Sequence, residues 1–237
     1  MAITLGKVGK VAGASASSMT VSWTGGGSNT AGSTLLLVYT STNSTADTVT
    51  TPTNWTLRAS GNSSGGNLFV YEWVNANAIS SQVLTTPAQA DASTLDIIEF
   101  TGAGSLDSST SIASSSGTTA TTNGITTVAA NTVLVGIFCA RSATVTARTL
   151  STPGTGFTQA QVNNQSSGNS TSQTSYITYD VVSATQSNKT TTCAINVSAN
   201  YNALMLAYAQ AAVGGPFPWF TRGMQCLDGL GCGGMRG

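Results

Sequence analysis

The residue types that most often carry catalysis are scarce in this 237-residue chain. It contains no histidine, and its 8 acidic residues balance its 8 basic ones. Without histidine the sequence offers no Ser-His-Asp triad, no Cys-His pair and no imidazole ligand for a metal ion. The loops also lack the clustered carboxylates that favour calcium. The sequence therefore predicts a non-enzymatic protein with no catalytic residue, no cofactor and no metal site.

Carboxylates are the remaining route to catalysis. A glycoside hydrolase needs two carboxyl groups facing one cleft, about 5 to 9.5 Å apart. Glu72 and Glu99 are the candidates, because their strands could be neighbours. However, no strand carries the acidic cluster usual for such an enzyme, and Glu72 matches Asp180 in an internal repeat. We therefore interpret Glu72 and Asp180 as equivalent surface carboxylates.

The four cysteines form two groups. Cys139 lies in an apolar segment and Cys193 alternates with Ile195, which predicts two buried thiols that pack as small apolar side chains. Cys226 and Cys232 enclose five residues near the C-terminus. They could form a disulfide within the chain, bridge to a neighbouring subunit or remain free thiols.

Charged residues make up only 7% of the chain, and the net charge is zero. A protein that binds nucleic acid needs a basic surface, so we expect no nucleic-acid partner. No stretch approaches the roughly 20 apolar residues that cross a bilayer, and the N-terminus lacks the apolar core of a signal peptide. We therefore expect that the protein does not insert into a membrane and that it is synthesised in a cytoplasm. Disorder is disfavoured, because 40% of the residues are hydrophobic and they alternate regularly.

The elements that must position any site occur twice. The segment Thr34–Thr42 matches residues 132–140 at an offset of 98 (132 − 34), and residues 68–74 match residues 176–182 at 108 (176 − 68). Trp55 matches Phe157 at 102, and residues 97–100 match 205–208 at 108. Because half a sandwich would expose an apolar face, we predict one β-sandwich over residues 1–212, with pseudo-repeats at about 19–104 and 118–212.

Alternation with a period of two predicts the individual strands. Residues 19–23 form a half-buried strand, and Thr34–Thr42 forms a central strand because it is almost continuously apolar. Residues 102–123 form a low-complexity linker whose second part is a weak strand, equivalent to residues 19–23. No segment has convincing helical periodicity. One face of the strand at 68–74 carries three aromatic residues, for which we favour core packing over a sugar-binding platform: Phe69, Tyr71 and Trp73.

Residues 213–237 differ from the rest of the chain because they combine many glycines with large apolar side chains. A segment of this composition cannot build a core of its own. We therefore predict a C-terminal docking arm, held against its own sandwich or against a neighbouring subunit. Its partner-docking residues are Phe217, Trp219, Phe220, Met224, Leu227 and Leu230.

The order of segments LLLVYT, PTNWTL, LFVYEWV and IIEFTGA, repeated in the second half, resembles the jelly-roll structural proteins of tailed bacteriophages. These include capsid decoration, head-fibre and tail-fibre-like modules. The resemblance covers roughly residues 19–212. It departs where Phe157 replaces the tryptophan, where Cys139 appears, and in the arm.

The resemblance implies an all-β fold, namely a jelly-roll-like antiparallel sandwich, and a non-enzymatic role at the virion surface as a capsid decoration, cement or head-fibre protein. The implied partners are other virion proteins, either the major shell protein or tail components, and further copies of the chain in a homo-oligomer such as a trimer. One alternative is a tail fibre or receptor-binding adhesin that binds a host-surface glycan. Another is a secreted carbohydrate-binding module.

Overall fold

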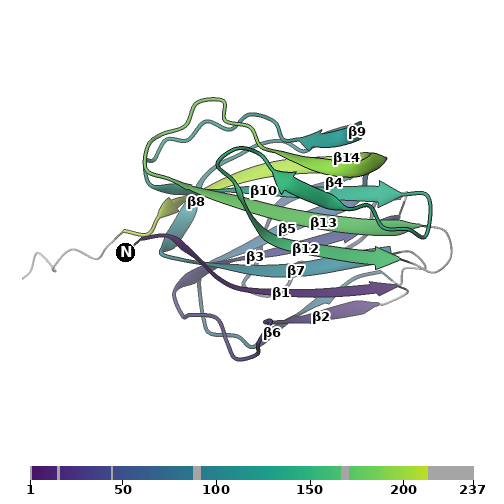
Figure 1. Ribbon diagram of the computed structural model, residues 1–237. Helices are drawn as coiled ribbons and strands as arrows, with labels where there is room; N and C mark the ends of the chain where they lie inside the picture. The colour runs from purple at the N-terminus through teal and green to yellow at the C-terminus, as the bar shows by residue number, and fades with distance from the viewer. Residues whose placement is uncertain (1, 15–16, 44, 88–91, 167–170, 213–237) are drawn as a thin grey trace, which may run out of the picture.

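The computed structural model describes residues 2–14, 17–43, 45–87, 92–166 and 171–212 (Figure 1). These residues form strands and no helix, and hence no helix that is long and apolar enough to cross a membrane. The strands are β1 (Thr4–Ala14), β2 (Ser18–Ser22), β3 (Ser33–Ser41), β4 (Thr56–Ser63), β5 (Gly66–Ala76), β6 (Ser81–Thr85), β7 (Ala92–Thr101), β8 (Ala103–Ser109), β9 (Ala113–Thr121), β10 (Thr132–Ser142), β11 (Leu150–Pro153), β12 (Thr158–Ser166), β13 (Ser172–Val182) and β14 (Thr192–Gln210).

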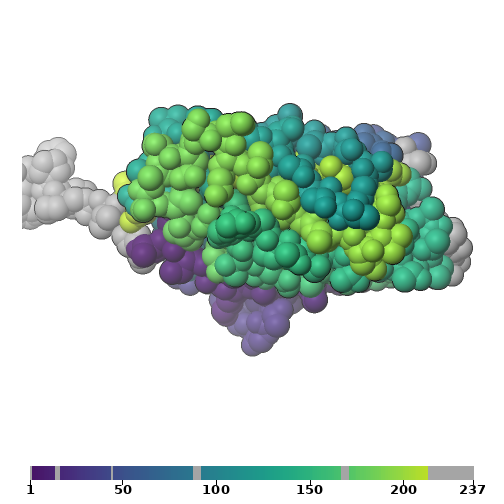
Figure 2. Space-filling view, turned by 45° about the horizontal axis from the view of Figure 1, so that its top comes forward, coloured from purple at the N-terminus to yellow at the C-terminus, as the bar shows by residue number. Residues whose placement is uncertain are grey.

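Each half of the chain builds its own antiparallel sheet. The first sheet has the order β1-β7-β3-β5-β4, and the second has the order β11-β14-β10-β13-β12, with β8 and β9 also pairing with β14. A two-stranded sheet, β2-β6, lies outside the first sheet (Figure 1). The predicted all-β sandwich is therefore confirmed, whereas a jelly-roll connectivity stays a prediction. Figure 2 shows a face formed mainly by the second half of the chain, with the purple N-terminal strands at its lower edge.

The two sheets repeat the same strand order and the same irregularity. The order β7-β3-β5-β4 corresponds to β14-β10-β13-β12. In the first sheet the register shifts between Leu57 and Ala59, and in the second it shifts between Gln159 and Gln161. These bulges are 102 residues apart (159 − 57), which is the offset predicted from Trp55 and Phe157.

Two of the other predicted offsets are wrong by one residue. With the bulges aligned, Val38 and its neighbour Val70 correspond to Ile137 and its neighbour Ile177. The offsets are therefore 99 (137 − 38) and 107 (177 − 70), not 98 and 108. Because side chains alternate between faces, a shift of one residue exchanges the two faces of a strand. The counterpart of Glu72 in the second half is therefore Tyr179 rather than Asp180.

The main core lies between the two sheets. It takes alternate residues from the central strands of both, chiefly Leu36, Val38, Leu68, Val70, Ile98 and Phe100 from the first sheet and Val133, Val135, Ile137, Ile177, Leu204 and Leu206 from the second. Burying these side chains on folding contributes about 25 cal/mol per Å² of apolar surface. This core holds the halves together as one unit.

The outer faces of the sheets are covered as well. Over the first sheet, β2 and β6 enclose a second core that includes Leu35, Leu37 and Tyr71. Because both faces of β3 are buried, its sequence is continuously apolar, and its predicted central position is confirmed. The predicted core packing of the aromatic residues is also confirmed: the rings of Trp55 and Trp73 pack edge to face with their centroids 5.9 Å apart.

The hydroxyl-rich linker between the halves forms β8 and β9. Both pair with β14, so they occupy the position along β14 that β1 occupies along β7. The prediction that the second part of the linker is equivalent to residues 19–23 is therefore wrong. A single bridge between Ile125 and Lys189 takes that position, in place of the longer pairing of β2 with β6.

Candidate functional site

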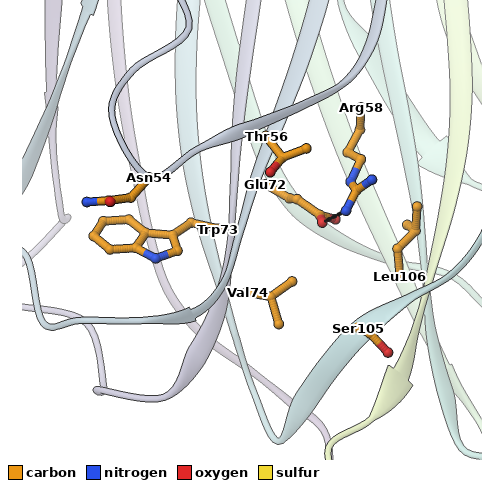
Figure 3. Close-up of a pocket in the computed structure, with 8 residues that line it drawn as sticks. All are labelled: Asn54, Thr56, Arg58, Glu72, Trp73, Val74, Ser105 and Leu106. Atoms are coloured by element: carbon orange, nitrogen blue, oxygen red, sulfur yellow. Dashed lines mark hydrogen bonds and ion pairs between the residues drawn. The ribbon is translucent and has the colours of Figure 1, made fainter.

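One side of the sandwich is open along the edge strand β4. Two hollows of about 610 and 420 Å³ lie between β4 and the segment that carries β8 and the start of β9, and Arg58 lines both. We call this pair of hollows the open seam. The first is lined by Asn54, Thr56, Arg58, Glu72, Trp73, Val74, Ser105 and Leu106 (Figure 3).

The opposite side of the sandwich is closed. There β1 lies against β12, and the Lys10 ammonium group donates a hydrogen bond of 2.9 Å to the Val162 carbonyl. The Asn163 amide donates another of 2.9 Å to the Val11 carbonyl. Along the open seam, the Ser63 hydroxyl of β4 joins the two sheets at one end by donating a hydrogen bond to the Asn202 side chain of β14.

An ion pair between Arg58 and Glu72 lies in the wall of the seam (Figure 3). Glu72 is 2% exposed and shares its face of β5 with Leu68 and Val70, so the interpretation as a surface carboxylate is wrong. Burial raises the pKa of Tyr208, from the opposite sheet, and the Glu72 charge raises it further. Arg58 is thus the counterion for a carboxylate that would otherwise be buried alone.

The proposed pairing of Glu72 with Glu99 is also wrong. Strand β3 lies between them, with Leu36 opposite Glu72 and Leu35 opposite Glu99. The two carboxylates therefore point to opposite faces of the sheet. Glu99 instead accepts hydrogen bonds from the backbone N–H groups of Lys7 (2.9 Å) and Thr30 (2.6 Å). It holds the irregular part of β1 at Lys7 and the loop before β3 to the outer face, and it does not contribute to the seam.

Asp180 occupies a third environment. It is half-buried on the outer side of β13, and burial raises its pKa while the nearby Lys189 lowers it. Its counterpart in the first half is Trp73, so the two carboxylates Glu72 and Asp180 are not equivalent by position. Among the described residues, no three acidic or cysteine side chains come together as a metal site.

A buried polar cluster lies between the sheets, away from the apolar core. Asp96 is fully buried there and accepts a hydrogen bond of 2.5 Å from the Ser175 hydroxyl. Ser175 in turn accepts one of 3.0 Å from Thr94, which is paired with Thr40 at 2.7 Å. Burial raises the pKa of Asp96 to about 7, although the hydrogen bonds from Ser175 and Asn163 and the charge of Lys10 lower it.

The two cysteines of the sandwich are buried free thiols, as predicted. Burial raises the pKa of Cys139 and of Cys193 to about 12. Both are therefore neutral at physiological pH, and the thiolate needed for nucleophilic attack is not formed. They pack as small apolar side chains.

The predicted docking residues Phe217, Trp219, Phe220, Met224, Leu227 and Leu230 lie outside the described residues, as do Cys226 and Cys232. The described chain ends beside the open seam. Ala211 donates a backbone hydrogen bond of 2.8 Å to Gly102, and its Cα lies 3.0 Å from the position that a Cβ on Gly104 would take. The next residue along β8, Ser105, already lines the first hollow.

The seam can do two things chemically. Each of its walls includes an edge strand, β4 or β8, that pairs on one side only among the described strands. An edge of this kind can accept an additional strand through its backbone N–H and C=O groups. Its side chains offer an aromatic ring, a guanidinium group and hydroxyl groups, which suit apolar and hydrogen-bonding partners.

Sequence reasoning did not identify the seam, because its walls come from segments with no catalytic or metal-binding pattern. The only available signal was the charge on Arg58 in an otherwise uncharged strand. Compared with known proteins, the chain matches no family profile, no curated protein and no solved structure.

Proposed function

We propose that this protein is a non-enzymatic structural protein of a tailed-bacteriophage virion, a capsid decoration, cement or head-fibre protein at the particle surface. In this proposal it is made in the host cytoplasm and forms a homo-oligomer on the shell. The observation that carries the proposal is the open seam, because a surface between two strand edges can bind an extended segment from a neighbour.

Two further features support this role. The apolar faces of both sheets are already covered within the chain, so its association with other subunits falls to edges, hollows and the arm. In addition, the arm at residues 213–237 supplies six large apolar side chains and follows directly on the segment beside the seam. Such side chains anchor interfaces when they fill pockets on a partner.

The first test is the number of copies of this chain per purified particle, measured by quantitative mass spectrometry against the major shell protein. A decoration or cement role predicts hundreds of copies. A few to a few dozen copies would instead assign the chain to the tail, and absence from particles would refute a virion role.

The second test is incorporation of a chain that ends at Ala212. We expect it to remain folded, because every cluster of the described core lies before this point, but to be lost from particles. Far-ultraviolet circular dichroism controls for folding. Normal incorporation of the shortened chain would contradict the role of the arm.

A tail fibre or receptor-binding adhesin is the second candidate. The observation that favours it is the half-buried Trp73 in the seam, where Asn54, Thr56 and Arg58 line the same hollow (Figure 3). Aromatic rings beside hydrogen-bonding groups are typical of small-ligand sites, including those for sugars. Under this proposal, Asn54→Ala and Thr56→Ala would reduce adsorption to host cells while leaving incorporation into particles unchanged.

A further inference from the structure

A small hollow on the second sheet brings together two arginines. Arg141 near the end of β10 and Arg148 in the following loop line a hollow of about 200 Å³. The other lining residues are small and polar or apolar, and they come from β9, the loop and β14: Ser116, Ala143, Ser198, Ala199 and Asn200. The hollow is distinct from the open seam and shares no residue with it.

An irregularity in β14 creates this hollow. The pairing of β14 with β9 jumps from Ala194 to Ala199, so four residues of β14 are inserted opposite a single residue of β9. The inserted residues interrupt the ladder between β14 and β9, and the last of them, Ser198, lines the hollow together with the two arginines. The second sheet can therefore form a hollow where a regular ladder would leave none.

The loop that carries Arg148 is fixed in place. The Thr174 hydroxyl donates a hydrogen bond of 2.8 Å to the Arg148 carbonyl, and the Ser172 hydroxyl donates one of 2.9 Å to the Thr146 carbonyl. The Thr149 N–H group donates to the Asn196 side chain at 3.0 Å. These contacts hold the backbone of Arg148 before any ligand binds, which lowers the entropy cost of binding.

Neither guanidinium group forms an ion pair with an acidic side chain of the described residues. The ion pair between Arg58 and Glu72 is the one found among the described residues, and no acidic side chain lines the hollow. The Nε atom of Arg148 is buried without a hydrogen-bond partner in the described structure. Two like charges in one hollow repel each other, and a buried unpaired N–H group is costly. A bound anion would relieve the repulsion between the two positive charges.

We propose that this hollow binds an oxyanion carried by a hydroxyl-rich ligand, specifically the carboxylate of an acidic monosaccharide unit. Guanidinium groups bind carboxylates through paired hydrogen bonds, and Ser116, Ser198 and Asn200 can bond sugar hydroxyls. At about 200 Å³ the hollow is smaller than most sites for drug-sized ligands, which suits a single sugar unit. This site does not depend on the proposed virion function.

The test is a titration of the full-length protein at low ionic strength, by isothermal calorimetry or by chemical-shift changes. The probes are glucuronate, inorganic sulfate and glucose, the last as the uncharged counterpart of glucuronate. We expect glucuronate to bind, sulfate to bind more weakly and glucose to show no measurable binding. Raising the salt concentration should weaken glucuronate binding, because the arginines are partly exposed.

Two variants identify the site. Arg141→Ala and Arg148→Ala, made separately, should each weaken glucuronate binding about tenfold or more, the effect expected when a charge-assisted hydrogen bond is lost. Lys7→Ala is the matched control, because it removes a positive charge elsewhere and should leave the affinity unchanged. Thermal melting of both variants shows whether they are folded.

Three outcomes would overturn the proposal. Absence of glucuronate and sulfate binding would refute an anion site. Equal weakening by Lys7→Ala would show that affinity follows net charge alone. Binding of sulfate as tight as that of glucuronate would retain the anion site but refute the saccharide as its ligand.

Discussion

Replacing Asp96 by asparagine removes the most strongly perturbed carboxyl group of the sandwich while keeping its size. In the folded protein, burial raises the pKa of Asp96 from 3.8 to about 7. The folded state therefore binds a proton between these two pH values that the unfolded chain releases. It follows that this group favours folding most strongly below about pH 4, and that its contribution is lost as the pH rises to about 7.

The size of the effect follows from the shift. Each pKa unit corresponds to about 1.4 kcal/mol, so a shift of about three units gives ~4 kcal/mol. Asparagine does not titrate. Between pH 4 and pH 8 the free energy of unfolding of the wild-type protein should therefore fall by ~4 kcal/mol relative to that of Asp96→Asn.

The assay is urea unfolding of both proteins at intervals from pH 4 to pH 8, with the difference in unfolding free energy plotted against pH. Ser175→Ala provides a second reading. It removes a hydrogen bond that lowers the pKa of Asp96, so the pH at which the difference levels off should rise. A difference between wild type and Asp96→Asn that stays constant from pH 4 to pH 8 would refute the reasoning.

Three other predictions concern the core, the seam and the thiols. Leu36→Ala should lower the free energy of unfolding by about 2 to 5 kcal/mol in urea titrations, because Leu36 is fully buried between the sheets; a loss below 1 kcal/mol would contradict this placement. Arg58→Ala should lower the free energy of unfolding by about 2 kcal/mol, because it leaves Glu72 buried without its counterion; this value is reduced for the partial exposure of Arg58. Adding Glu72→Gln should restore part of the lost stability. Cys139 and Cys193 should react with a thiol reagent only after denaturation, and rapid labelling of either thiol in the native protein, located by mass spectrometry, would contradict their burial.

The sequence predicted those parts of the fold that rest on apolar patterning. The segment Thr34–Thr42 is apolar on both faces because β3 is covered on both sides, and this signal is local. The repeat could also be detected, because Trp55 and Phe157 occupy equivalent places before equivalent bulges. The burial of Cys139 and Cys193 could likewise be predicted, because each lies in a local apolar pattern.

The face on which a polar side chain lies was harder to predict. Glu72 follows Tyr71 in a strand with both faces buried, so alternation alone does not reveal which face is the interior. An error of one residue in the repeat offset then placed Glu72 at the surface and matched it with Asp180. Only the cross-strand register decides this, and it depends on residues far away in the sequence.

The arginine hollow and the open seam could not be predicted from the sequence for a related reason. Arg141 and Arg148 share a hollow because β14 is irregular about 50 residues further along the chain, where Ala194 and Ala199 flank the insertion. The linker that forms β8 has too few apolar residues to predict a strand. It is ordered because β14 offers it a ladder of backbone hydrogen bonds.

The two sheets of the sandwich are bonded to each other along the closed side and much less along the open side. Hydrogen bonds from Lys10 and Asn163 bind β1 to β12, while β4 is held to the opposite sheet mainly near Ser63. Thermal fluctuations that separate the two sheets should therefore begin at β4. A partner that fills the open side would hold the two sheets together there. It would slow unfolding more than a partner that buries the same area elsewhere on the surface.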